Sequence, residues 1–216
     1  MIRIFAVHTA TALIEPVTAL FKEYLPEVKL NHIADDSLIQ EVIANGEVTP
    51  MVKKRMLNYY YAAIDAGADY IFNTCSSVGE VADNANLFLP VPVIRIDEQM
   101  ALKAIDISAK IGVIATLPTT LGPTANLLKR KAAEKGKTIS IVEGLAEGAF
   151  EAGMSGNRDK HDALILEASK KIASQVDVIV LAQGSMARME QQLAQESGKI
   201  VLSSPLLGVL GLKNLL

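Results

Sequence analysis

Short apolar runs alternate along this chain with longer segments in which apolar residues recur every three or four positions. The short runs predict strands at residues 2–7, 29–33, 70–73, 93–96, 111–115, 138–142, 178–181 and 200–202. The longer segments predict helices at residues 14–24, 50–66, 123–135, 161–174 and 186–197. Continuously apolar strands that alternate with helices are typical of parallel sheets covered on both faces.

The boundaries of one helix are marked clearly. Thr49 and Pro50 have the residue types preferred at an N-cap and at the first helical position, and Gly67 is suited to the end of the helix. We therefore expect a helix from Pro50 to about Ala66. Along it, a stripe of Met51, Leu57, Tyr61 and Ile64 predicts core or a subunit interface.

The pattern of strands and helices occurs twice. Thr9 corresponds to Thr116 at an offset of 107 residues, and Asp69 corresponds to Asp177 at an offset of 108. Further blocks keep the same spacing, including Val93-Ile94 against Val201-Leu202. Separated blocks with a nearly constant offset indicate an internal duplication.

The duplication predicts an α/β protein with two pseudo-symmetric lobes, each a mostly parallel sheet flanked by helices. We assign residues 1–97 with 205–216 to the first lobe and residues 98–204 to the second. In open parallel sheets, ligands bind beyond the carboxyl ends of the strands. We therefore expect the polar clusters at those ends to meet in a cleft between the lobes.

Composition narrows the class of protein. Half of the 216 residues are hydrophobic, yet no apolar run reaches the length of a membrane span, and the N-terminus lacks a signal-peptide pattern. A single cysteine excludes an internal disulfide, which fits a cytoplasmic location. The net charge of −3 without a long basic run indicates neither nucleic-acid nor membrane binding. The apolar composition suggests a homodimer.

Cys75 lies in the segment Asn73-Thr74-Cys75-Ser76-Ser77, directly after a predicted strand. A free cysteine is often a small buried hydrophobe. Here the polar neighbours offer N–H and O–H donors to a thiolate or a bound anion, and a helix is expected just after Ser77. This context favours a catalytic role for Cys75, with Asn73, Thr74 and Ser76 as substrate-binding residues.

Histidines provide a further candidate. His8 lies with Thr9 at the end of the first predicted strand. We assign His8 as a candidate acid/base or hydrogen-bond donor to substrate, with a structural histidine as the alternative, and we assign Thr9 to substrate binding. His32 and His161 lack such a position, and we expect them to be structural or on the surface. Three scattered histidines and one cysteine show no metal-ligand spacing, so no metal is expected.

The second repeat carries a threonine cluster. Thr116, Thr119 and Thr120 follow a predicted strand and precede a helix, an arrangement suited to binding a carboxylate. N-capping by Thr120 is the alternative, which leaves the other two threonines unexplained. No glycine-rich phosphate-binding motif is present, so we expect no nucleotide cofactor.

Residues 143–160 contain four glycines and alternating charges. This segment is either a mobile lid, in which Arg158 meets an anionic substrate, or an exposed helix and loop.

Taken together, these residues resemble the aspartate/glutamate/hydantoin racemase superfamily over essentially the whole chain. The resemblance rests on the duplicated units, residues 73–77, residues 92–98, and residues 111–116 with Thr119 and Thr120. It implies two α/β lobes, no cofactor, and a pair of cysteines that remove and return a proton beside a carboxylate. Cys75 matches the cysteine of the first lobe, and the threonines match a carboxylate-binding segment.

The position of the second cysteine departs from this pattern. Gln183 occupies it, followed by Gly184 and Ser185, which we assign with Gln183 to substrate binding. An amide cannot serve as the acid or base that two-base racemisation needs on the second face. The sequence therefore predicts a racemase or isomerase of a small anionic substrate, such as an amino acid. Either another residue, such as His8, serves the second face, or the reaction uses one base, as in an isomerase or decarboxylase. A protein that binds a small anion without turnover is the remaining alternative.

Overall fold

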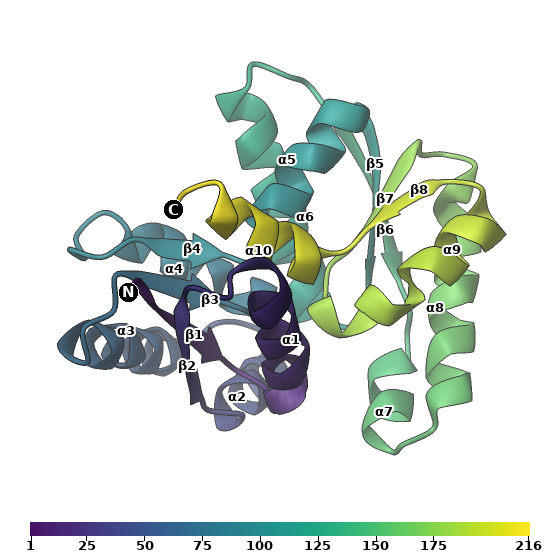
Figure 1. Ribbon diagram of the computed structural model, residues 1–216. Helices are drawn as coiled ribbons and strands as arrows, with labels where there is room; N and C mark the ends of the chain where they lie inside the picture. Colours follow the sequence, from purple (N-terminus) through teal and green to yellow (C-terminus); the bar gives the residue numbers. More distant parts are fainter. The chain divides into compact units, whose positions relative to one another are not determined.

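The computed structural model describes residues 1–216. The chain divides into two compact units, the first comprising Met1–Glu98 and Pro205–Leu216 and the second Gln99–Ser204. Each unit contains a four-stranded parallel sheet flanked by helices, which confirms the predicted α/β fold class (Figure 1). No helix combines the length and the apolar character that crossing a membrane requires.

The first sheet has the strand order β2-β1-β3-β4, and the second has the order β6-β5-β7-β8. The strands are β1 (Arg3–His8), β2 (Lys29–Ala34), β3 (Tyr70–Asn73), β4 (Val93–Arg95), β5 (Lys110–Ala115), β6 (Ser140–Leu145), β7 (Val178–Leu181) and β8 (Ile200–Leu202). The two orders are the same when β1 is matched to β5, and β3 to β7. The repeat seen in the sequence is therefore a repeat of topology.

The helices alternate with the strands along the chain. They are α1 (Ile14–Tyr24), α2 (Ser37–Asn45), α3 (Pro50–Asp65), α4 (Gly79–Ala85), α5 (Glu98–Ile107), α6 (Pro118–Glu134), α7 (Ala149–Met154), α8 (Arg158–Ala173), α9 (Glu190–Ser197) and α10 (Ser204–Lys213). Three 3₁₀ helices span Thr11–Leu13, Ser76–Val78 and Gly184–Met189.

Alternation along β1 sends side chains to two separate cores. Ile4 and Ala6 pack with α1 and α10 on one face of the first sheet, whereas Val7 packs with α2, α3 and α4 on the other. Successive residues of a strand point to opposite faces, so residue parity decides which core a side chain joins. In the second unit, α8 and α9 pack on the face that contains Ile114 and Leu181, and α6 packs against β5 and β6.

The start of α3 is as the sequence predicted. The hydroxyl of Thr49 accepts a hydrogen bond from the N–H of Val52 at 3.1 Å, and Pro50 is the first helical residue. Gly67 has a φ of +82°, a conformation that glycine adopts without steric cost. Of the predicted stripe on this helix, Met51 and Tyr61 are 55% and 47% exposed and are not part of the core. The buried face contains Val52, Met56, Tyr60 and Ala63. A subunit interface at the exposed residues stays a prediction.

Helix α6 begins five residues earlier than predicted, at Pro118 rather than at Pro123. Pro118 occupies the first turn, where proline is well tolerated, and Pro123 lies inside the helix. Thr120 is consequently not the N-cap. The cap residue is Leu117, and Thr120 lies within the first turn.

Candidate active site

Polar residues of the first unit gather at the carboxyl ends of β1 and β3. His8 ends β1 and Asn73 ends β3, and the neighbouring Thr9 and Thr74 are buried as well. Cys75 follows in an extended conformation, is partly exposed and immediately precedes the 3₁₀ helix Ser76–Val78. The polar cluster anticipated after β3 thus lies at the edge of the sheet where parallel α/β folds bind ligands.

Asn73 holds the main chain at Cys75 in place. The side-chain amide of Asn73 donates to the carbonyl of Cys75 at 3.0 Å, and the hydroxyl of Tyr60 donates to the Asn73 side-chain oxygen at 3.2 Å. Burial raises the pKa of Tyr60 well above its usual value, so its hydroxyl remains a donor. The side chain of Cys75 packs against the core on the α2–α4 side of the sheet.

A buried ion pair supports the residue that follows the cysteine. The guanidinium of Arg95 donates from Nε and Nη2 to the two carboxylate oxygens of Asp97 at 2.9 and 2.8 Å, and from Nη1 to Asp83 at 2.6 Å. Burial opposes ionisation of Asp97, but the charge and hydrogen bonds of Arg95, with a hydrogen bond from Ser76, leave its pKa below the ordinary value. Ser76, the residue after Cys75, is therefore hydrogen-bonded to this buried ion pair.

His8 contacts Thr74 and a second histidine. Its Nδ1 lies 2.9 Å from the hydroxyl oxygen of Thr74, and its Nε2 lies 2.9 Å from Nδ1 of His32. Residues two positions apart along an extended chain point to the same face, so Thr74 lies on the face of Phe72, which is the α1 side of the sheet. Cys75 packs on the opposite side. The structure therefore brings His8 together with Thr74 and His32, and both of its ring nitrogens are occupied.

We expect the buried His8 to make stability fall with pH below neutrality. Desolvation, together with the nearby His32, lowers the pKa of His8 from 6.5 to about 4. Because the folded-state pKa is the lower one, the unfolded chain binds more protons between these values, and folding stability falls as pH decreases from about 6.5 to about 4. The loss amounts to about 3 kcal/mol for a shift of this size.

Urea unfolding at pH 7 and pH 4, with wild type and His8→Asn, checks this expectation. The stability difference between the two proteins should narrow by about this amount at the lower pH. A difference that stays constant across the range would contradict it.

In the second unit, Gln183 is fixed to the loop after β5. Its side-chain oxygen accepts from the main-chain N–H of Thr116 at 2.7 Å and from the Thr116 hydroxyl at 3.0 Å, and its amide nitrogen lies 2.8 Å from the same hydroxyl. The amide is therefore an ordered part of this sheet edge.

The other residues predicted for the second unit have different environments. The hydroxyl oxygen of Thr119 is buried without a hydrogen-bond partner, and Thr120 is buried in the first turn of α6. Gly184 and Ser185 begin the 3₁₀ helix Gly184–Met189, and Ser185 is exposed. An unpartnered buried hydroxyl in the first turn of α6 is a suitable donor for an added ligand.

Cys75 and Gln183 occupy equivalent places in their units. Asn73 pairs with Val7 of β1 in the first sheet, and Leu181 pairs with Ile114 of β5 in the second; each candidate residue follows its strand by two positions. Their backbone angles are nearly the same, with φ −121° and ψ 118° for Cys75 and φ −121° and ψ 129° for Gln183. Each also precedes a 3₁₀ helix.

The segment for which either a lid or an exposed helix and loop was expected is largely regular structure. Residues 143–160 include the end of β6, the whole of α7 and the first turn of α8, and α7 packs against α8. On the same unit, Arg188 donates to the carboxylate of Asp162 at 2.6 Å, which joins the 3₁₀ helix after Gln183 to α8.

Sequence reasoning missed three contributors, His32, Tyr60 and the Arg95–Asp97 pair. His32 was expected to be structural or on the surface, and it is half-buried against His8. One signal was available for the ion pair. An arginine inside an apolar strand, with an aspartate two residues later, places opposite charges on the same side of the chain.

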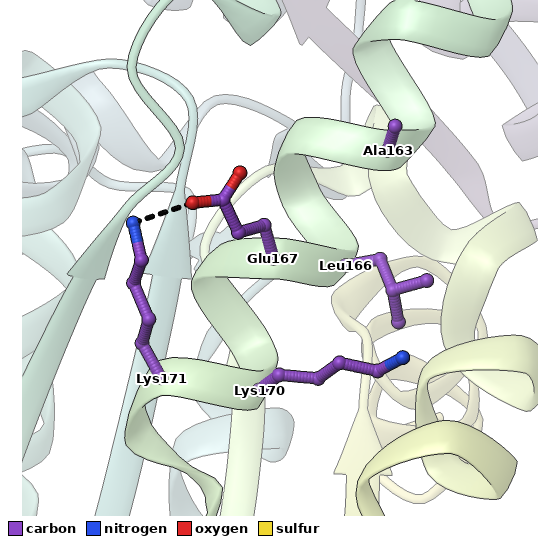
Figure 2. Close-up of a pocket in the computed structure, with 5 residues that line it drawn as sticks. All are labelled: Ala163, Leu166, Glu167, Lys170 and Lys171. Atoms are coloured by element: carbon purple, nitrogen blue, oxygen red, sulfur yellow. Dashed lines mark ion pairs between the residues drawn. The ribbon is translucent and has the colours of Figure 1, made fainter.

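A pocket of different character lies on the surface of α8. Figure 2 shows the residues that line it, Ala163, Leu166, Glu167, Lys170 and Lys171, with the Glu167–Lys171 ion pair drawn as a dashed line. All five come from α8, and none lies at the carboxyl end of a strand. We therefore place the candidate chemistry at the sheet edges and not in this pocket.

Comparison with solved structures supports the fold. An allantoin racemase from Klebsiella pneumoniae superposes with a TM-score of 0.70 at 18% identity, covering 100% of this chain and 87% of the other. A glutamate racemase from Francisella tularensis gives 0.76 at 13% identity, with 99% and 80% covered. An aspartate racemase from Picrophilus torridus gives 0.74 at 11% identity, with 99% and 95% covered.

At these identities the likeness concerns the fold alone. No curated protein matches the chain at a significant level. The profile of the family described as Asp/Glu/Hydantoin racemase matches residues 2–210, which is nearly the full length. The chain therefore belongs to the Asp/Glu/hydantoin racemase family.

Proposed function

We propose that the protein is a cofactor-independent racemase or isomerase that acts on the carbon next to a carboxylate of a small anionic substrate. The observation that carries this proposal is that Cys75 and Gln183 occupy equivalent positions after corresponding strands of the two repeated units, in a chain of a racemase family. Cys75 is the acid/base, and Thr116, Thr119 and Gln183 bind or polarise the carboxylate.

The role of Gln183 decides between two-base and one-base chemistry. A side-chain amide neither accepts nor releases a proton at physiological pH, so only Cys75 of this pair can exchange one. We therefore propose that the protein labilises a proton on one face of the substrate. Isomerisation, or decarboxylation followed by protonation from Cys75, is consistent with such a site.

Proton exchange in heavy water tests the proposal. The enzyme is incubated in D₂O with separate enantiomers of small amino acids and related carboxylic acids, and deuterium is followed by mass spectrometry and configuration by chiral chromatography. One-base chemistry predicts deuterium in a substrate or product of unchanged configuration. Deuterium with inverted configuration would instead show that a second acid/base exists and that Gln183 does not limit the reaction.

A Gln183→Cys variant extends the test, because it restores an acid/base at the second position. We expect this variant to raise the ratio of inversion to exchange with retention at least tenfold over wild type, within the range that a positioned acid/base supplies. Gln183→Ser is the matched control, since it removes the same amide without adding a thiol. An equal ratio in both variants would contradict the assignment of this position.

A protein that binds a small anion without turnover is the second candidate, favoured by the absence of a second ionisable group at residue 183. Alkylation by iodoacetamide distinguishes the two, because Cys75 is the only thiol and its modification is unambiguous. An activated thiol predicts a rate at pH 7 more than about tenfold above that of free cysteine. A rate at or below that of free cysteine, with no exchange of any tested acid, would support the binding protein.

A further inference from the structure

A continuous hydrogen-bonded chain of two threonines and two histidines lies on the α1 side of the first sheet. In order, its members are Thr74, His8, His32 and Thr18. The Thr74 hydroxyl oxygen lies 2.9 Å from Nδ1 of His8, Nε2 of His8 lies 2.9 Å from Nδ1 of His32, and Nε2 of His32 lies 3.0 Å from the Thr18 hydroxyl oxygen. At the two ends, each threonine hydroxyl also contacts a main-chain carbonyl, at 3.1 Å on β1 and at 2.7 Å on α1.

Protons are too few to fill this chain when both rings are neutral. Three contacts between side chains and two with carbonyls make five contacts, each of which needs one proton. Each of the two threonines supplies one proton and each of the two neutral imidazoles supplies one, which makes one proton fewer than the contacts need. If both hydroxyls donate to carbonyls, the rings must donate to the hydroxyls, and two nitrogen lone pairs then face each other across 2.9 Å.

Two neutral arrangements avoid that repulsion. In the first, both rings carry hydrogen on Nδ1, and Thr18 turns its hydroxyl from its carbonyl toward His32. In the second, both rings carry hydrogen on Nε2, and Thr74 turns its hydroxyl toward His8. The β1 carbonyl then still accepts the main-chain N–H of Thr74, at 3.1 Å. The two rings therefore always carry the same tautomer.

An added proton has one place to go. It fills the contact between the two rings, and all five contacts are then satisfied. A second added proton would place two N–H groups against each other, so the pair accepts one proton and not two.

We propose that His32 is a positioning residue that locks the tautomer of His8 to its own, so that the pair moves or accepts a single proton as a unit. The direction of the Thr74 hydroxyl, one residue before Cys75, is set by the same equilibrium. The use of this proton relay in turnover is the only part of the proposal that rests on the proposed function. In turnover, the relay would lead from Thr74, beside Cys75, to the half-buried His32 and Thr18.

Few charged groups can disturb this relay. Among the elements packed on this side, the charged residues of α1, β2 and α10 are exposed: Glu15, Lys22, Glu23, Lys29 and Lys213. Tyr24, the last residue of α1, is partly buried, and its hydrogen bond with Glu23 raises its pKa, so it stays neutral. Asp35, which follows β2, is bound by Arg55 and by the hydroxyl of Tyr59. The charge that acts on His8 is that of His32.

Imidazole ¹⁵N NMR of the full-length protein tests the proposal without any substrate. In wild type, we expect His8 and His32 to show the same ratio of Nδ1–H to Nε2–H. His161 lies in the second unit and does not belong to this hydrogen-bonded chain of side chains. A His161→Gln variant therefore identifies its resonances and should leave those of the other two rings unchanged.

Two nearly isosteric variants give opposite predictions. Thr18→Val removes the hydroxyl that contacts Nε2 of His32. An N–H at Nε2 would then have no acceptor, whereas a lone pair there is tolerated better, so both rings should shift to Nδ1–H. Thr74→Val acts from the other end, and both rings should shift to Nε2–H. A change at Thr18 would thus set the tautomer of His8, to which Thr18 is connected only through His32.

Opposite tautomers of the two rings in wild type would overturn the proposal, as would a His8 tautomer that is unaffected by Thr18→Val. Uptake of two protons by the pair in one pH range would also overturn it. Because these readouts need no turnover, failure of the relay is distinct from failure of the proposed function. Loss of the tautomer coupling with deuterium exchange intact refutes only the relay, and coupled tautomers without any exchange refute only the enzyme.

Discussion

Replacing Cys75 by alanine is expected to abolish proton exchange while leaving the fold intact. A positioned acid/base typically contributes about 10²–10⁴-fold to rate, and no other residue at this strand end in the first unit carries a thiol. The side chain is only partly buried where it packs against the core, so truncation should have a modest effect on stability. Deuterium exchange and urea unfolding, measured on the same preparation, separate the two effects.

Cys75→Ser is the matched control for this prediction. Its hydroxyl nearly preserves the size of the thiol, but it is a much weaker acid, so we expect exchange to fall almost as far as with alanine. If either variant kept more than about a tenth of wild-type exchange, the assignment of Cys75 as the acid/base would be wrong, given the contribution expected of such a group.

Removing the carboxylate of Asp97 is expected to cause the largest loss of stability. Asp97 and Arg95 are 1% and 2% exposed, and the pair is held by two hydrogen bonds at 2.9 and 2.8 Å. Deleting one partner of a buried pair leaves the other charge poorly compensated, which costs about 3–5 kcal/mol. Arg95 would keep only its contact with Asp83, at 2.6 Å. Chemical denaturation of Asp97→Ala should show this loss.

Acid should remove the same stabilisation in the wild type. Burial opposes the ionised form of Asp97, but Arg95 outweighs it, and the pKa of Asp97 is below its ordinary value. The contribution is therefore present above the unfolded-state pKa and is lost as pH falls through the folded-state value. Glu167→Gln is the control, since it breaks the exposed pair with Lys171 seen in Figure 2 and should leave stability unchanged.

Gly79 offers an independent check on the ion pair. A Cβ atom added at Gly79 would lie 2.2 Å from Cζ of Arg95, so Gly79→Ala displaces the guanidinium. In an Arg95→Ala background the obstruction disappears, and the two substitutions should cost clearly less together than the sum of their separate effects. Additive effects would show that the crowding at Gly79 is relieved elsewhere.

The sequence by itself determined the fold class, because the signals for it are local. Apolar runs of strand length, the Thr49–Pro50 helix start and the Gly67 helix end depend on near neighbours. The helix start and end appear where they were predicted, and all the predicted strands occur, with bounds that differ by no more than about three residues. The matching strand orders of the two sheets follow the same duplicated pattern. Cys75 and Gln183 could be compared because a repeat at a nearly constant offset preserves position relative to each strand.

Only the tertiary structure decided which of the polar residues meet. His8 and Cys75 end neighbouring strands, but residue parity sends His8 to Thr74 and His32 and sends Cys75 to the opposite core. His32, 24 residues from His8, joins the site because β2 lies next to β1. Such contacts depend on strand order and on the face each side chain takes, which combine over long separations and leave no local pattern in the sequence.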